Sequence, residues 1–268
     1  MIISWTQDSS SMWFNNICLL VAVFAARCEG GTVQNNKQKL IFGGSPLPIT
    51  EAPYMAQYLF NDSNICGASI IHKNFVVSAA HCYIPEQKQH ILVGSDKVNE
   101  GQRYDIKKTI VHPEYDKKTE HNYDVAVIML SSPLQFSDSV KPIEMAPRNL
   151  ALNSGDTLMT MGFGRTEKLP TSPILLSVKV SYVTDKDCNE IFEKNNRSPI
   201  TEQMMCAGGV IGEDSCKGDS GGPLVHDNLL VGIVSFGYSC GSSLPAVYTR
   251  VSAVRDFIDT TIDKLNNV

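Results

Sequence analysis

Short apolar runs rich in β-branched residues recur along most of the chain. Turn residues separate these runs at intervals typical of all-β proteins. The pattern predicts an all-β protein in which the loop-like stretch 131–156 connects two β units. The predicted strands cover residues 66–71, 75–78, 89–93, 124–130, 157–161, 176–182, 229–234 and 246–251.

Only the C-terminal end has a clear helical periodicity. Its apolar positions recur at three- and four-residue intervals, which predicts a helix that packs on the body of the protein and carries no chemistry. Ser252 is the candidate N-cap. The apolar face consists of Val254, Phe257, Ile258, Thr261, Ile262 and Leu265.

The N-terminal part of the chain has a different pattern. Residues 12–26 form an apolar run that is short for a membrane span and is followed by small residues. We predict a signal peptide over residues 1–28, cut before Glu29, and therefore a secreted, extracellular protein with no membrane anchor. A buried helix of the mature domain is the alternative. Residues 29–40 are polar, and the composition changes abruptly at Ile41.

Composition and charge narrow the class of protein. The chain has 268 residues, of which 43% are hydrophobic, so it can bury a substantial core in one large domain or two small ones. Its formal net charge is −5 and its pI is near 5.7. With no Lys/Arg cluster in the sequence, these values argue against a nucleic-acid partner.

The cysteine count indicates disulfide bonds. Of the eight cysteines, Cys18 and Cys28 fall in the predicted signal peptide. Six remain, an even number in a chain bound for an oxidising compartment. A structural zinc site is the alternative, but the usual Cys-x-x-Cys spacing does not occur in the sequence. We therefore expect disulfides and no metal.

Ser220 is the candidate nucleophile. A serine hydroxyl reacts only when a base takes its proton and the developing oxyanion is stabilised. Ser220 follows Gly218 and Asp219 and precedes two glycines, which permit a tight turn and let backbone N–H groups approach a bound carbonyl. The amides of Gly218 and Ser220 are the candidate oxyanion hole. A Gly-x-Ser-Gly turn alone is a weak signal, because such loops are common.

Four segments in order resemble the trypsin/chymotrypsin family of serine proteases. They are residues 78–82 (SAAHC), 122–126 (NYDVA), 214–223 (DSCKGDSGGP) and 234–237 (VSFG). The resemblance extends from Ile41 to the C-terminus. It implies a protease domain over residues 41–268, with two six-stranded antiparallel β-barrels, an active site between them and a C-terminal α-helix.

The resemblance also assigns catalytic roles, in the order His, Asp, Ser. His81 is the expected general base and then general acid, and Asp124 is expected to orient its imidazole. His121 lies nearer to Asp124 in sequence and is the rival base. Its matching position in the family lines the substrate groove, so we favour His81. The family pairs Cys66 with Cys82, Cys188 with Cys206, and Cys216 with Cys240.

Asp214 matches the residue that places a carboxylate at the base of the specificity pocket in trypsin-like members. A desolvated carboxylate favours a substrate Lys or Arg; a surface acid beside a disulfide is the alternative. Gly237 matches the glycine that keeps the pocket open. Ala246 stands where trypsins usually have glycine, so its methyl group is expected to restrict the pocket.

Further residues are expected to line the substrate groove. Ser235 and Phe236 belong to the segment that resembles the substrate-binding strand, with Phe236 in place of the usual tryptophan. Lys217 is expected at the pocket mouth, where it disfavours basic residues flanking the cut. The substrate-binding set is Asp214, Ser235, Gly237, Ala246, Lys217 and His121.

Ile41 resembles the new N-terminus that activation creates in this family, which makes residues 29–40 a propeptide. The freed amino group is expected to pair with Asp219 and to shape the oxyanion hole. Leu40 departs from the family, which has Lys or Arg before the isoleucine. Activation therefore needs a protease of another preference, or a cut after Lys39 followed by trimming.

Two surface features are also read from the sequence. The acidic loop that binds calcium in many trypsins is shortened here to residues 94–100, with Ser95 in place of a ligand glutamate, so we expect no tight metal site. Asn61 begins a glycosylation sequon, and Asn196 begins a second one that Pro199 weakens.

The sequence thus predicts a secreted serine endopeptidase that cuts after Lys or Arg and is made as a zymogen. We expect a monomer without cofactor, with protein or peptide substrates and protein protease inhibitors as binding partners. The alternative is a regulatory, toxin-like or binding protein on the same scaffold, with narrow or non-trypsin specificity.

Overall fold

The computed structural model describes residues 43–267. The predicted signal peptide, the propeptide and Ile41 lie outside these residues. Within the described part of the chain, no helix has the length and apolar character needed to cross a membrane.

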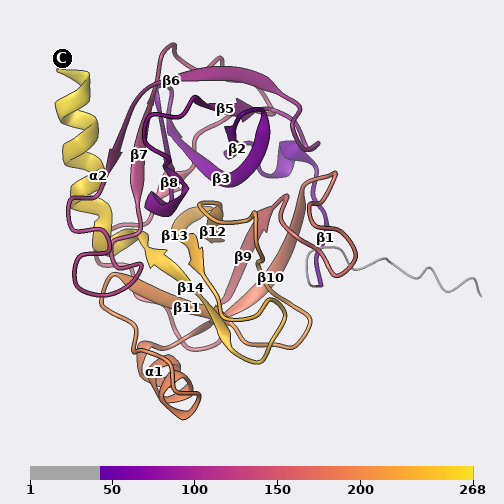
Figure 1. Cartoon of the computed structure of the whole chain (residues 1–268), viewed down its shortest axis with the longest axis vertical. Coiled ribbons are helices and arrows are strands. Elements are labelled where there is room, and N and C mark those ends of the chain that lie inside the picture. Colours follow the sequence, from indigo (N-terminus) through magenta and orange to yellow (C-terminus); the bar gives the residue numbers. More distant parts are fainter. Residues whose placement is uncertain (1–42, 268) are drawn as a thin grey trace, which may run out of the picture. The chain divides into compact units, whose positions relative to one another are not determined.

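Six antiparallel strands of the N-terminal half close into a barrel, seen in the upper part of Figure 1. In barrel order they are β2 (Met55–Phe60), β3 (Ser63–His72), β4 (Phe75–Ser78), β7 (Ala126–Leu130), β6 (Gln102–Val111) and β5 (Gln89–Val93). Strands β2, β4 and β5 are almost entirely buried. Most of their residues are apolar, as such a position requires, and Gln57, Gln89 and His90 are buried polar exceptions.

A second six-stranded ring follows, because β9 pairs with both β10 and β12. Its strands in ring order are β9 (Thr157–Gly162), β10 (Leu176–Val183), β11 (Met204–Gly208), β14 (Pro245–Arg250), β13 (Leu229–Phe236) and β12 (Pro223–His226). Two short strands join this sheet: β1 (Ser45–Pro46) beside β10, and β8 (Glu144–Met145) beside β13. The predicted fold of two six-stranded antiparallel barrels is confirmed, and residues 131–156 connect them as expected.

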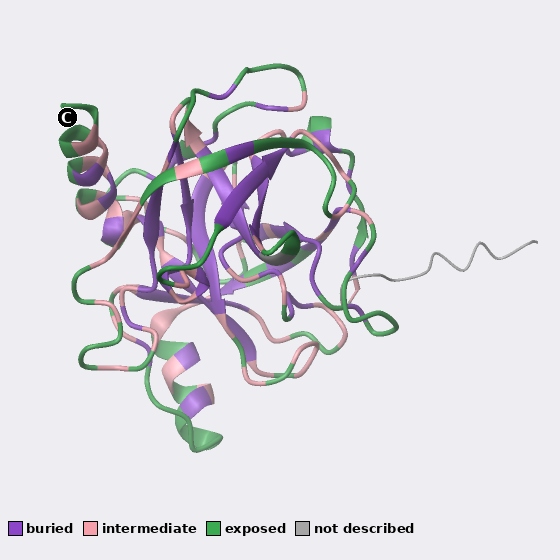
Figure 2. Ribbon diagram, turned by 45° about the horizontal axis from the view of Figure 1, so that its top comes forward, coloured by how far each residue is buried: buried purple, intermediate pink, exposed green. Residues whose placement is uncertain are grey.

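Large buried side chains fill both barrels, which are largely purple in Figure 2. Tyr58 and Phe75 are fully buried in the first barrel, and Phe163 and Tyr248 in the second. Burial of each such side chain contributes roughly 1.5–3 kcal/mol. The Tyr58 hydroxyl donates to Gln89 Oε1 at 2.9 Å, so its polar end is satisfied. The site described below is therefore held by two rigid bodies.

The C-terminal helix α2 (Val251–Asn266) matches the prediction in extent and in its buried face. Val254, Ile258 and Thr261 are buried, and the other three predicted face residues pack against the core while partly exposed. The prediction of Ser252 as N-cap is wrong: the helix begins at Val251, and Arg250 precedes it without a side-chain cap. The helix begins earlier because β14 runs directly into it. Figure 1 shows α2 beside the first barrel.

A second helix, α1 (Asp185–Lys194), projects from the second barrel (Figure 1). The expectation that only the chain end is helical is therefore wrong. Thr184 caps α1 by accepting a hydrogen bond from the Asp187 amide at 3.1 Å. Cys188 and Phe192, four residues apart, form its buried face. Two 3₁₀ turns, η1 (Ile49–Glu51) and η2 (Ala80–Cys82), complete the regular structure.

Candidate active site

His81 lies in η2, directly after β4, where the Cys66–Cys82 disulfide ties the turn to β3. Its Nδ1 is 2.7 Å from Asp124 Oδ2. Its backbone N–H donates to the other oxygen, Oδ1, at 3.0 Å. One carboxylate thus fixes both the turn and the ring, and the second ring nitrogen, Nε2, is left for proton transfer.

Asp124 is fully buried at the junction of the two barrels. Ser235 Oγ on β13 donates to its Oδ2 at 2.6 Å, and Thr249 Oγ1 on β14 donates to its carbonyl at 2.8 Å. Burial raises the pKa of this carboxyl, but hydrogen bonds from His81 and Ser235 and the charge of His81 outweigh it. The pKa of Asp124 therefore lies below its ordinary value, and the residue is ionised at neutral pH.

Ser235 lines the pocket described below, but its hydroxyl is directed to Asp124. The hydroxyl is therefore already engaged, and the part of Ser235 in substrate binding stays a prediction. The sequence offered no signal for the contact with Asp124, since the two residues are 111 positions apart.

His121 lies beside His81 without replacing it. The two ring centroids are 5.9 Å apart in an edge-on arrangement, and the His121 ring is 5.0 Å from that of Phe236. Within residues 43–267 the hydrogen bonds to the Asp124 carboxylate come from His81 and Ser235, not from His121. The geometry thus favours His81 as the base. His121 is not among the residues that line the pocket beside Ser220, and its part in substrate binding stays a prediction.

The turn that holds Ser220 is anchored against the first barrel. The Gly67 amide of β3 donates to the Ser220 carbonyl at 2.7 Å. Gly221 has a φ of +77°, and a Cβ at this position would lie 2.1 Å from Ser78 Oγ and 3.0 Å from the Ala79 nitrogen. Only glycine permits this approach, which brings Ser220 next to the segment that leads into His81.

The proposed oxyanion hole is open in this structure. Gly218 has a φ of +96°, and a Cβ there would be 3.0 Å from Gly164 Cα. Among residues 43–267, the amides of Gly218 and Ser220 have no hydrogen-bond acceptor. Two N–H groups on one turn are therefore available to a ligand oxygen.

Asp219 is buried behind this turn. Its two oxygens accept hydrogen bonds from the Gly164 amide at 2.8 Å and the Cys216 amide at 2.9 Å. Burial raises its pKa to about 6, and these two bonds lower it only in part. No Lys, Arg or His side chain among the described residues forms an ion pair with Asp219, and Ile41, its predicted partner, lies outside them.

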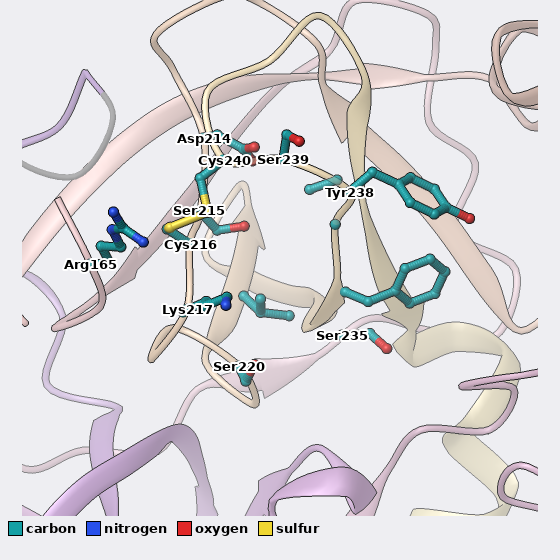
Figure 3. Close-up of a pocket in the computed structure, with 14 residues that line it drawn as sticks. Arg165, Asp214, Ser215, Cys216, Lys217, Ser220, Ser235, Tyr238, Ser239 and Cys240 are labelled. Carbon is teal, nitrogen blue, oxygen red and sulfur yellow. A yellow bond between two sulfur atoms is a disulfide. The ribbon is translucent and has the colours of Figure 1, made fainter. Parts of the chain in front are cut away.

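A pocket of about 470 Å³ opens beside Ser220 (Figure 3). Asp214 is buried in its wall, with an exposed fraction of 4%. Its Oδ2 accepts from the Gly241 amide at 3.1 Å, whereas Oδ1 is buried and has no hydrogen-bond partner within the described residues. Burial raises its pKa to about 7, and the backbone amides of Gly241 and Ser215 offset only part of this rise. The pocket thus presents a carboxyl oxygen without a partner.

Gly237 and Ala246 both line the pocket. A Cβ at Gly237 would lie 3.9 Å from the Cβ of Ala246, so the two residues are neighbours on the pocket wall. The methyl group of Ala246 is therefore part of the pocket wall, as expected from the sequence.

Several pocket-lining residues were missed in the sequence, among them Tyr238 and Arg165. Tyr238 directly follows Gly237, so the assignment of Gly237 to the pocket could have pointed to it. The guanidinium of Arg197 lies 4.1 Å from the ring centroid of Tyr238. Arg165 is 52 positions before Lys217, and the two meet because the Arg165 amide donates to the Lys217 carbonyl at 2.7 Å. That contact exists only in the folded chain.

The structure contains the three disulfides that the family resemblance implied. They are Cys66–Cys82, Cys188–Cys206 and Cys216–Cys240. Cys66, Cys82 and His81 lie close enough to suggest a metal site. Because the two sulfurs are bonded to each other, they offer no thiolate ligands.

The shortened loop 94–100 is held by a side chain. Gln57 on β2 is buried, and its Nε2 donates to the carbonyls of Lys97 at 3.0 Å and Glu100 at 3.1 Å. Its Oε1 accepts from the Asn99 amide at 2.8 Å. The Gln57 side chain thus already donates hydrogen bonds to two loop carbonyls, which are oxygen atoms of the kind that bind calcium.

Comparisons with known proteins agree with this geometry. The family model described as Trypsin matches residues 41–258. The chain is 37% identical to Trypsin 5G1 of Aedes aegypti over 224 residues, which is 81% of this chain and 83% of that protein. It is 37% identical to the Vitellin-degrading protease of Bombyx mori over 84% of this chain and 86% of that protein. It is 35% identical to a Trypsin of Phaedon cochleariae over 90% and 96% of the two chains. The chain therefore belongs to the trypsin family of serine endopeptidases.

Proposed function

We propose that this chain is a secreted endopeptidase that cuts on the carboxyl side of Lys or Arg, and that cleavage before Ile41 activates it. One observation carries the specificity: a buried Asp214 oxygen without a partner among residues 43–267, in a pocket that opens at Ser220. A substrate cation in the pocket supplies that partner. An apolar side chain leaves the carboxylate desolvated and unpaired.

The proposed catalytic cycle uses three side chains. Ser220 Oγ attacks the scissile carbonyl carbon while His81 Nε2 takes the hydroxyl proton. The imidazolium that forms is stabilised by Asp124 at 2.7 Å, and the oxyanion by the Gly218 and Ser220 amides. His81 then gives the proton to the leaving amine, which departs and leaves an acyl-enzyme. Water, deprotonated by His81, hydrolyses the ester and restores Ser220.

Activation is proposed to create a cation for Asp219. The α-amino group of Ile41, freed by cleavage, pairs with this buried carboxyl and lowers its raised pKa. The position of Gly43 supports this: a Cβ there would lie 2.5 Å from the Gly212 carbonyl, so the chain two residues after Ile41 packs against the segment before Asp214. Because Leu40 precedes Ile41, we expect another protease to make this cut. N-terminal sequencing of active protein checks the assignment.

Secretion is supported by the disulfides and the predicted signal peptide. Three disulfides in a chain of this size are typical of an oxidising compartment. We expect the mature protein to act as a monomer on protein substrates outside the cell.

A cleavage profile tests the proposed specificity. Activated protein is incubated with a peptide library in which the residue before the cut varies, with Ser220→Ala as the control. We expect cuts after Lys and Arg, and none in the control. Cuts mainly after apolar residues, or cleavage by the control, would contradict the proposal.

A further inference from the structure

Arg165 and Lys217 form a cationic wall at the mouth of the pocket. Both side chains are exposed and both line the pocket that holds Ser220. The hydrogen bond from the Arg165 amide to the Lys217 carbonyl, 2.7 Å long, holds the two backbones together. Figure 3 shows both residues on one side of the pocket and Tyr238 on the other, with Ser220 at the lower edge.

Neither Arg165 nor Lys217 forms an ion pair with a carboxylate of the described residues. Within the described residues, the ion pairs involve other Lys and Arg side chains, and no carboxylate lies within pairing distance of Arg165 or Lys217. Asp214 is the single acid among the pocket-lining residues, and it is buried away from the mouth. In a chain with a formal net charge of −5, these two unpaired cations give the surroundings of the nucleophile a local positive charge.

The opposite wall is aromatic. Phe236 and Tyr238 follow Ser235 at the end of β13, and their ring centroids are 6.0 Å apart. If substrate residues before the cut run along this strand, as the proposed function requires, the chain after the cut leaves on the other side of Ser220. That side is the cationic wall.

We propose that Arg165 and Lys217 select substrates with an acidic residue at the first or second position after the cut. The inference rests on the proposed function and narrows its substrate class to Lys or Arg followed closely by Asp or Glu. A carboxylate there pairs with two exposed cations whose charges otherwise repel each other.

The chain's own activation segment does not fit this preference. Residues 30–50 contain Lys37 and Lys39 but no Asp or Glu. Ile41 and Phe42, the residues after the proposed activating cut, are apolar. The cationic wall therefore adds a second reason, besides Leu40, why the protein is a poor substrate for itself.

The test uses activated full-length protein and peptides with Arg before the cut. Glu, Ala or Lys is placed at one position at a time. The positions varied are the two residues before the Arg and the two residues after the cut. We expect kcat/KM to be higher for Glu than for Ala after the cut, and the Glu-over-Ala ratio to fall about two- to fivefold in Lys217→Gln and in Arg165→Gln. Lys217→Glu is expected to reverse the preference toward Lys.

Two controls separate this pairing from a general charge effect. Lys179→Gln removes one exposed, unpaired cation on β10, outside the pocket, and should leave the ratio unchanged. Raising NaCl from about 0.02 M to about 0.5 M shortens the Debye length to about 4 Å and should reduce the ratio in the unmodified protein.

The outcomes also separate this inference from the proposed function. Three results would overturn the inference and leave the specificity for Lys and Arg intact. They are cleavage after Arg with no gain in kcat/KM for Glu over Ala, a gain only when Glu stands before the cut, and a Glu-over-Ala ratio that neither Gln variant changes. Failure to cut any Arg peptide would overturn the proposed function itself.

Discussion

Asp124 and Asp214 are both buried carboxyl groups, yet their surroundings shift their pKa values in opposite directions. Asp124 accepts hydrogen bonds from His81 and Ser235, so its pKa falls despite burial. Asp214 is stabilised only by backbone amides and keeps one oxygen without a side-chain partner in residues 43–267, so burial raises its pKa to about 7. The difference suits the two roles: one carboxylate is permanently ionised, and the other gains full ionisation from a bound cation.

This difference predicts a pH-dependent affinity for small cations. Below its raised pKa, Asp214 is a neutral acid that cannot pair with an amidinium; above it, the carboxylate can. Benzamidine binding to a Ser220→Ala background, measured by calorimetry, should tighten as pH rises from about 5 to about 8, by up to about tenfold per unit below the pKa. In Asp214→Asn, binding should be weak and its pH dependence flatter. An equal pH dependence in the two proteins would contradict this account of Asp214.

At the scale of elements, the turn after β5 depends on a neighbouring strand. Gln57 on β2 satisfies two carbonyls and one amide of loop 94–100 with a single buried side chain. The loop therefore has an internal replacement for the cation that acidic loops of this kind bind.

Two measurements of thermal unfolding test this replacement. EDTA is expected to leave Tm unchanged, because the loop carbonyls already have donors. Gln57→Ala should lower stability by about 1–3 kcal/mol, because it removes the hydrogen bonds that this buried side chain makes to the loop. Gln135→Ala, at an exposed position, is the matched control. A drop in Tm on adding EDTA to the unmodified protein would show that the loop depends on a metal.

Burial explains only part of what the sequence could predict, because the buried strands β2, β11 and β12 were not predicted. Strands β4 and β5 were predicted to the residue because they are short, apolar and buried on both sides. Strand β6 was missed because most of its residues are exposed or only partly buried, so it lacks an apolar run. Helix α1 was missed although Thr184 and Asp187 offered a capping signal, since its two buried residues are too few for a visible periodicity.

For the candidate site, the sequence could predict only those residues that stand in recognisable local motifs. Ser220, His81 and Asp124 stand in local motifs that the sequence displays directly. Arg165 has no such motif, because its place beside Lys217 comes from a contact between distant segments. Residues of this kind can be found only after folding has brought the segments together.

At the scale of the whole molecule, the site depends on how the two barrels meet. Asp124 and His81 belong to the first barrel, whereas Ser220 belongs to the second half of the chain. Gly221 permits the approach, because its Cα faces Ser78 and the Gly67 carbonyl at a distance that leaves no room for a side chain.

Replacing this glycine should separate the barrels. Gly221→Ala places a methyl group 2.1 Å from Ser78 Oγ, whereas Gly155→Ala, at a similar φ of +84°, meets nothing within 4 Å. Both variants are destabilised by the positive φ, so the difference between their free energies of unfolding reports the steric contact alone. We expect Gly221→Ala to be the less stable by about 1–3 kcal/mol in urea unfolding. Equal stabilities would mean that the barrels tolerate this methyl group.

The most direct measurement of the central claim is active-site labelling of the cleaved chain. Protein whose N-terminus is verified as Ile41 is treated with a fluorophosphonate and analysed by mass spectrometry, with Ser220→Ala and uncleaved protein as controls. The account predicts one adduct per chain, on Ser220, and little or none in either control. No adduct on the verified protein, or an adduct on another residue, would contradict the assignment of Ser220 as the nucleophile.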